Sequence, residues 1–372
     1  MKRKNLESHS KYSKEDKQVG MFSCSLSSTK LAVLLVLCLQ NSLYTLLRRY
    51  SQGYLQEVYS KYEVLLAAEF IKFVFSIFMV SGSLQPDQQL IPHVKELIRS
   101  SSKMFFLSLM YGAMNILSFV ALRNIDAGTF TIFAQLKILT TATFSTILLD
   151  RKYTYARWRA LIELVLGALL FSSHIFSENH ESTLKSDDVS PLLGIAAVVT
   201  EVTTSGFASI YFERVIKNSQ DNLNIWERNL QLAYASTPIY LCFIFYNGGG
   251  DVGYGGGWTT ITLCLSFIGA AGGMLVALSI KYADAIMKTL ATTGAIVLSS
   301  ILDHFLLGGP LTPVMLLAGG VVVLAICNYT FDLTPESHLK KNHSSIAFTR
   351  VSSQAEDDNS EDDLIESSQG KV

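Results

Sequence analysis

The chain has 372 residues, of which 49% are hydrophobic and only 16% charged, and its formal net charge is −1. Soluble domains carry about 25% charged residues. The composition therefore excludes a soluble enzyme, a disordered protein and a disulfide scaffold. Most of the chain consists of continuous apolar runs of about 20 residues, each long enough to cross a bilayer core of about 30 Å. Because outer-membrane barrels alternate apolar and polar residues, these runs predict an all-α polytopic membrane protein.

The apolar runs predict ten transmembrane helices within a single domain, 30–331. The polar segment 1–29 predicts a cytosolic N-terminal tail without a cleavable signal peptide. The segment 332–372 is rich in serine and acidic residues, so it predicts a disordered acidic cytosolic tail. The expected spans are 30–49, 62–83, 102–123, 127–149, 157–176, 191–212, 226–246, 258–280, 284–307 and 310–331.

The basic residues support an even number of spans with both termini in the cytosol. With that orientation, most of the 30 Lys and Arg residues fall in the tails or in loops on the cytosolic side, as the positive-inside rule requires. Eight or twelve spans would give the same parity. The opposite loops hold only Arg48, Arg49, Lys61, Arg123 and Lys185.

The five cysteines are scattered and form no CxxC pair or His-containing metal spacing. We therefore predict no metal site, no cofactor and no disulfide framework. In a membrane protein the charged residues are distributed unequally between the two sides of the membrane, so the net charge of the whole chain does not indicate a partner. Nothing in the sequence predicts nucleic-acid binding.

Two lysines, Lys137 and Lys288, lie inside the fourth and ninth predicted spans, 151 residues apart. Five spans in each half would invert the second half relative to the first, as in many secondary transporters, and would make both lysines fourth-helix residues. An ionisable group at membrane depth must face the bundle interior or a watery cavity. Two lysines that meet there predict an anion site suited to phosphate. The alternative is that each pairs with an intramembrane acid, namely Glu69, Glu163, Glu201 or Asp303.

Other polar residues share helix faces within the predicted spans. Glu69 and Lys72 are spaced i, i+3, which suits either an internal ion pair or a ligand contact. Tyr111 and Asn115 are spaced i, i+4 and could present an aromatic face and an amide to a nucleobase, or bond to a neighbouring helix. Asn229 adds an amide near a helix end. Small residues such as those around Gly206 predict close helix packing.

At this point the sequence resembles the nucleotide-sugar transporters of the drug/metabolite transporter superfamily, in the branch of CMP-sialic acid, UDP-galactose and UDP-N-acetylglucosamine carriers. The resemblance covers about 30–331, and the order and spacing of its motifs are more specific than any one of them. The motifs are Glu69-Phe70-Ile71-Lys72, Gln135-Leu136-Lys137-Ile138-Leu139-Thr140-Thr141-Ala142, Ser205-Gly206-Phe207-Ala208, Tyr211-Phe212-Glu213-Arg214, Arg228-Asn229-Leu230-Gln231-Leu232, Lys281-Tyr282-Ala283-Asp284 and Ile286-Met287-Lys288, with Ile296-Val297-Leu298-Ser299 following.

The resemblance implies two inverted five-helix repeats in a Golgi membrane, with the ER second. It implies exchange of a cytosolic nucleotide-sugar for a lumenal nucleoside monophosphate. Lys137 and Lys288 would hold phosphate, and Gly206 would allow close helix approach. The remaining implied substrate-binding residues are Tyr111, Asn115, Thr141, Ser205 and Asn229 lining the cavity, with Glu69 and Lys72 at its edge.

The chain departs from the family pattern at three places. Met114 and Ile116 stand where the family commonly has Gln and a second Asn, and Phe130 stands where a tyrosine is common. The resemblance therefore does not carry over two contacts to the base or ribose, and an unusual or broad specificity is open.

Residues near the motifs favour a UDP-sugar, either UDP-galactose or UDP-N-acetylglucosamine. Leu139 and Thr140 follow the UDP-sugar pattern, whereas the CMP-sialic acid carriers tend to have a proline there, and Ala233 replaces a tyrosine of the CMP type. A CMP-sialic acid/CMP antiporter remains the alternative, together with a transport-inactive scaffold of the same fold.

A homo-oligomer or an association with a glycosyltransferase is left open. A membrane-embedded glycosyltransferase is disfavoured because no DxD motif is present, so we do not expect an enzyme. Two core lysines argue against an exporter of cations.

Overall fold

The computed structural model describes residues 28–84, 89–172, 190–217, 223–246 and 253–331, and all regular secondary structure in these residues is helical. Both predicted tails lie almost wholly outside the described residues. The helices are the first helix, Ser28–Tyr54, which ends in the π-helical turn η1 (Tyr50–Tyr54), followed by α2 (Lys61–Ser83), α3 (Leu90–Arg99), α4 (Ser102–Asn124), α5 (Ala127–Gln135), α6 (Lys137–Leu148), α7 (Tyr155–Phe171), α9 (Pro191–Lys217), α10 (Ile225–Tyr246), α11 (Thr260–Tyr282), α12 (Ala285–Leu307) and α13 (Pro313–Thr330).

Eight of the helical segments are long and apolar enough to cross a membrane. They correspond to all the predicted spans except the fifth and seventh, which form α7 and α10. Helix α7 has 17 residues, and α10 carries Glu227 and Arg228 near its start. Large apolar side chains are exposed along the bundle, as expected where lipid replaces water; examples are Leu39, Phe78, Leu109, Leu166, Leu317 and Leu324. The all-helical multi-pass membrane fold is thus confirmed, whereas the count of ten stays a prediction.

Short polar side chains fix where several of these helices begin. Asp126 accepts a hydrogen bond from the Thr129 N–H at the start of α5, and Asp284 accepts one from the Met287 N–H at the start of α12. Thr259 forms a reciprocal capping box with Thr262 at the start of α11. Such caps satisfy backbone N–H groups that have no partner within the helix.

The fourth predicted span is not the uninterrupted helix that its apolar pattern suggested. It consists of α5 and α6, which meet at Leu136, where the Leu136 N–H bonds to the Phe133 carbonyl only three residues back. Lys137 is therefore the first residue of α6. The backbone at Leu136 stays right-handed helical (φ −62°, ψ −15°), so the interruption is a local tightening of the helix.

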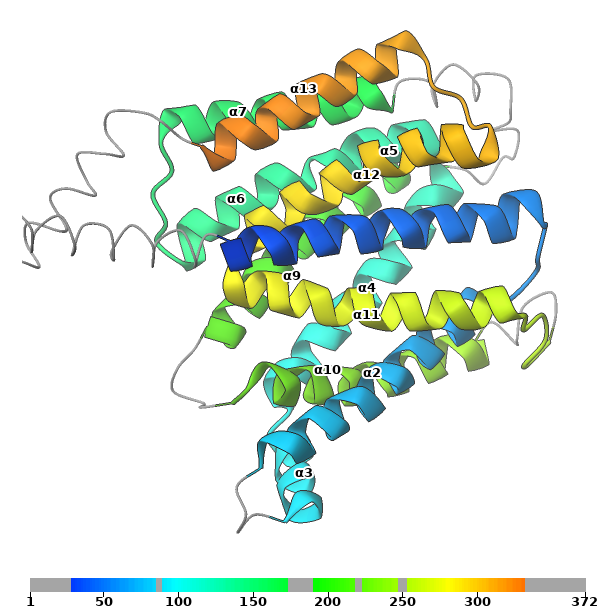
Figure 1. The fold of residues 1–372 in the computed structure, drawn as a ribbon, viewed down its shortest axis with the longest axis vertical. Coiled ribbons are helices and arrows are strands. Elements are labelled where there is room, and N and C mark those ends of the chain that lie inside the picture. Colours follow the sequence, from blue (N-terminus) through cyan, green and yellow to red (C-terminus); the bar gives the residue numbers. More distant parts are fainter. Residues whose placement is uncertain (1–27, 85–88, 173–189, 218–222, 247–252, 332–372) are drawn as a thin grey trace, which may run out of the picture.

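The helices form one bundle whose two edges are built from different pairs (Figure 1). Helices α7 and α13 pack together at one edge, and α2 and α10 pack together at the other. Between them, α9 contacts both α4 and α6, while the first helix runs through the middle of the view. One apolar core joins α6, α7, α12 and α13, and a second joins α4, α9, α10 and α11.

Candidate functional site

Lys137 and Lys288 come from neighbouring helices of the bundle. Helix α12 packs on both α6 and α9, and the Lys288 Nζ lies 3.5 Å from the Ser209 Oγ of α9. The helices that carry the two lysines, α6 and α12, are in contact. Their depths differ from the prediction in one respect. Lys288 is the fourth residue of α12, one turn from its start, and not well inside the span.

The alternative that each lysine forms an ion pair does not hold for the described residues. None of their carboxylates lies within 4 Å of either ammonium, and three of the four candidate acids have other partners. Glu69 pairs with Lys72, Glu163 with Arg159, and Asp303 with Arg49. Glu201 attracts Lys137, and Glu213 attracts Lys288, without closing to an ion pair. Two mutually repelling cations in an apolar bundle form a favourable place for a multiply charged anion.

The small residues of α9 bring this helix against α6. A side-chain carbon added to Gly206 would lie 2.6 Å from the Thr140 Oγ1 and 2.9 Å from the Thr140 carbonyl carbon. Ser205 is buried beside it, and Thr141 is fully buried and donates to the Lys137 carbonyl. These contacts place Ser205 and Thr141 in the wall that holds Lys137.

Glu69 and Lys72 of α2 form the internal ion pair that their spacing allowed, with the Lys72 Nζ 2.7 Å from the Glu69 Oε2. Both also line a cavity of about 240 Å³ between the first helix, α2 and α11. Gln40, Asn41 and Tyr44 of the first helix line the same cavity. Sequence reasoning missed these three residues, because amides and tyrosines inside an apolar run carry no spacing signal.

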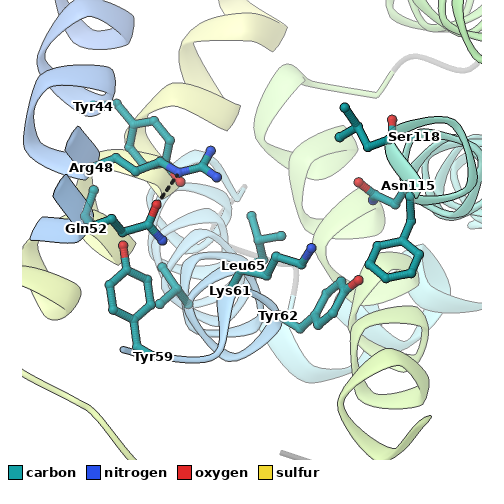
Figure 2. A pocket seen from close by; sticks show the side chains of 13 residues that line it. Tyr44, Arg48, Gln52, Tyr59, Lys61, Tyr62, Leu65, Asn115 and Ser118 are labelled. Carbon is teal, nitrogen blue, oxygen red and sulfur yellow. Dashed lines mark hydrogen bonds between the residues drawn. The ribbon is translucent and has the colours of Figure 1, made fainter. Parts of the chain in front are cut away.

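A second cavity, of about 230 Å³, adjoins the first and includes Asn115 (Figure 2). Its polar side chains come from the end of the first helix, the start of α2 and the middle of α4. Arg48 and Gln52 are hydrogen-bonded on one side of it, and Lys61 and Tyr62 face Asn115 across it. The labelled lining residues are Tyr44, Arg48, Gln52, Tyr59, Lys61, Tyr62, Leu65, Asn115 and Ser118.

Tyr111 lies one turn before Asn115 on α4 and packs in the core shared with α9, α10 and α11. Tyr111 is not among the lining residues of either cavity.

Asn229 stands apart from the cavities just described. It is fully buried in the second turn of α10, its Nδ2 donates to the Ile225 carbonyl, and its Oδ1 has no hydrogen-bond partner. Three residues depart from the family pattern. Met114 and Phe130 pack against apolar cores, whereas Ile116 is exposed and lines a further surface pocket.

A charged cluster connects three helices at the end of the bundle opposite the two cavities. The fully buried Glu213 of α9 bonds to Arg151 after α6 at 2.5 Å, to Lys217 at 2.7 Å and to the Ala285 N–H of α12 at 3.0 Å. Arg151 also lies 3.8 Å from Asp284. In the sequence, Arg151 counted only as a positive charge in a cytosolic loop, so this connection was missed.

A multi-pass helical bundle with polar cavities at one end, a charged closure at the other and two repelling lysines between defines a membrane carrier for an anionic solute. Comparison with known proteins identifies the family. Residues 25–330 match the nucleotide-sugar transporter family, and the chain belongs to this family. It is therefore a transporter and not an enzyme.

Similar curated proteins include three UDP-sugar carriers. A UDP-N-acetylglucosamine/UDP-N-acetylgalactosamine transporter of Caenorhabditis elegans is 33% identical, over 85% of this chain and 97% of its own length. A UDP-N-acetylglucosamine transporter of Mus musculus is 31% identical, over 82% and 96%. The UDP-galactose translocator of Mus musculus is 37% identical, over 60% and 57%. A solved crystal structure matches with a TM-score of 0.59 at 14% identity, over 83% of this chain and 99% of that chain, which concerns the fold alone.

Proposed function

We propose that this protein is a nucleotide-sugar:nucleoside-monophosphate antiporter that imports UDP-galactose or UDP-N-acetylglucosamine into the Golgi lumen in exchange for UMP. The named substrates of its relatives support the UDP-sugar class. The observation that carries the proposal is that Lys137 and Lys288 lie on contacting helices, with no carboxylate of the described residues within 4 Å of either ammonium. A diphosphate, or the phosphate of UMP, supplies the negative charge that this arrangement favours.

The same two lysines give a physical reason for exchange. In the empty carrier the two ammonium groups repel each other and have lost part of their hydration. A bound anion offsets both costs, so the loaded carrier crosses between its two states more easily than the empty one. Release on one side is then followed by uptake of another anion before the carrier returns.

The pairing of helices supports an architecture of two inverted five-helix repeats. Each helix of one half has a counterpart five predicted spans away in the other half, so that α2 corresponds to α10 and α4 corresponds to α11. Under this correspondence the α2–α11 contact matches the α10–α4 contact, and the α2–α10 and α7–α13 contacts each match themselves. The same exchange relates two ion pairs, Arg49–Asp303 and Arg151–Glu213, with their charges reversed. In this architecture both termini are cytosolic, the two cavities open toward the lumen, and the Glu213 cluster closes the cytosolic side.

The experiment is exchange in proteoliposomes preloaded with UMP, with CMP or with no nucleotide. Labelled UDP-galactose, UDP-N-acetylglucosamine and CMP-sialic acid are supplied outside. We expect uptake of a UDP-sugar that depends on internal UMP. Full-rate uptake into empty vesicles would contradict obligatory exchange.

Two other outcomes would replace the proposal. Uptake with internal CMP alone would indicate a CMP-sialic acid/CMP antiporter, for which Leu139, Thr140 and Ala233 would have misled us. No exchange by folded protein with any pair would indicate a transport-inactive scaffold. Associations with itself or with a glycosyltransferase are separate questions, to be tested by co-purification from the native membrane.

A further inference from the structure

The cavity between the first helix, α2 and α11 is separate from the lysine pair and has a different chemistry. It is lined by Gln40, Asn41 and Tyr44 on one side and by Glu69 and Lys72 on the other. The only charged side chains in this lining are Glu69 and Lys72, which neutralise each other at 2.7 Å. Its volume of about 240 Å³ is below the range of about 300–1,000 Å³ usual for sites that enclose a whole drug-sized ligand. The cavity therefore suits one neutral polar group of a larger substrate.

Apart from the Glu69 Oε2, which is ion-paired with Lys72, two buried polar atoms in the lining have no hydrogen-bond partner. They are the Oε1 of Gln40, an acceptor, and the Nδ2 of Asn41, a donor. The Gln40 amide is held in place because its Nε2 donates to the Ile268 carbonyl of α11 at 2.9 Å. Leaving a buried polar group unpaired costs free energy, and such groups in native proteins call for an explanation. A ligand that offers both a donor and an acceptor would satisfy both atoms.

The glycine pair of α11 makes room for these polar side chains. A side-chain carbon at Gly272 would lie 2.5 Å from the Gln40 Nε2, and one at Gly273 would lie 3.4 Å from the Lys72 Nζ. The small residues at this point therefore admit an amide and an ammonium, in addition to letting helices approach. The two glycines of α11 therefore make room for polar side chains that come from the first helix and from α2.

We propose that this cavity is the subsite for the neutral hexosyl group of the substrate, and that Gln40 and Asn41 hydrogen-bond its hydroxyl groups. This inference rests on the proposed function and names the part of the site that recognises the sugar. A sugar hydroxyl both donates and accepts, which matches the two unpaired atoms. Because Glu69 and Lys72 neutralise each other, the cavity presents no net positive charge to a phosphate, and Lys137 and Lys288 lie outside its lining.

The test uses two near-isosteric variants of the full-length protein, Asn41→Leu and Gln40→Met, in proteoliposomes loaded with UMP. Each variant is assayed for exchange of UMP, which has no sugar, and of UDP-galactose and UDP-N-acetylglucosamine. We expect kcat/KM for at least one UDP-sugar to fall about tenfold relative to kcat/KM for UMP, as for the loss of a hydrogen bond in a buried site. UMP/UMP exchange should stay within twofold of the unaltered protein.

Ser42→Ala is the matched control. Ser42 adjoins Asn41 and is also buried, but its hydroxyl bonds to the Cys38 and Ala295 carbonyls and takes no part in the cavity lining. We expect its ratio of UDP-sugar to UMP exchange to be unchanged. Thermal unfolding gives a second readout. Asn41→Leu should not lower the melting temperature of the unliganded protein, because it removes an unpaired buried donor.

Equal loss of UMP and UDP-sugar exchange, with a lower melting temperature, would show that Gln40 and Asn41 are structural, and would overturn the subsite. Unchanged exchange ratios in both variants would also overturn it. Absence of UMP exchange in the unaltered protein would instead overturn the proposed function, and the subsite with it.

Discussion

The guanidinium of Arg151 lies 2.5 Å from the carboxylate of Glu213, which is fully buried among α9, the loop after α6 and the start of α12. Lys217 and the Ala285 N–H bond to the same carboxylate. One acidic side chain thus holds together segments that are more than 60 residues apart along the chain. The cluster thus ties the end of α9 to the loop after α6 and to the start of α12.

Replacing Glu213 by Gln should destabilise the protein and slow exchange. The substitution leaves Arg151 and Lys217 facing each other without their shared anion. Breaking a buried ion pair costs about 3–5 kcal/mol, and we expect the lower end because the Arg151 and Lys217 side chains are 28% and 35% exposed. The measurements are the melting temperature and the rate of UMP exchange, which should fall at least tenfold.

Glu163→Gln is the control for this change. Glu163 also faces an arginine and accepts a hydrogen bond from Asn328, but its side chain is 38% exposed and its distance to Arg159 is 3.6 Å. Exposed pairs contribute about 0–1 kcal/mol, so the control should stay within twofold of the unaltered protein. If both variants behaved alike, the Glu213 cluster would not be a closure.

We predict that replacing a lysine of the pair lowers transport but does not lower the stability of the unliganded protein. Lys288→Met should abolish nucleotide-dependent exchange, since a hydrogen bond to a charged group contributes about 1.5–3 kcal/mol, equivalent to about 10–100-fold. In the absence of nucleotide, the melting temperature should stay equal or rise, because a repelled buried cation has been removed. Lys137→Ala should lose transport in the same way while still reaching the membrane.

Lys281→Ala provides the comparison for both lysine variants. Lys281 lies at the exposed end of α11, over the Tyr282 ring, and its loss should leave exchange within twofold. Near-normal uptake by the Lys137 or the Lys288 variant would show that the replaced lysine is not part of the substrate site.

Gly206→Ala should separate α9 from α6. The added carbon would lie 2.9 Å from the Thr140 carbonyl carbon, and a backbone atom cannot move aside as the end of a side chain can. We expect a lower melting temperature and at least tenfold slower exchange, because Thr140 is only three residues from Lys137. Overpacking of this kind costs about 1–3 kcal/mol.

Gly82→Ala tests whether the loss of stability and exchange in Gly206→Ala arises from the close contact with Thr140 and not from the replacement of a glycine as such. Nothing lies within 4 Å of a carbon added at Gly82 of α2. Replacing a helical glycine by alanine then stabilises by up to about 1 kcal/mol. A fall in melting temperature as large as that of Gly206→Ala would contradict the close-contact explanation.

The apolar pattern was enough to predict the all-helical membrane fold and most of the helix boundaries, because hydrocarbon requires about 20 apolar residues for each crossing. Asp126, Thr259 and Asp284 reinforce three of the helix starts, since their side chains accept from the backbone N–H three residues on. Lys137 and Lys288 stood out because a charge at such depth is costly wherever it occurs.

Which charges neighbour each other and which amides line a cavity depends on how the helices pack, and the sequence pattern does not reveal it. Glu69 pairs with Lys72 within one helix, but Asp303 pairs with Arg49 and Glu213 with Arg151 across long stretches of chain. Gln40 and Asn41 lie in an apolar run whose pattern is the same whether they face lipid, protein or a cavity. Their role depends on Gly272 and Gly273 of a distant helix, and such packing between helices carries no signal in the local sequence.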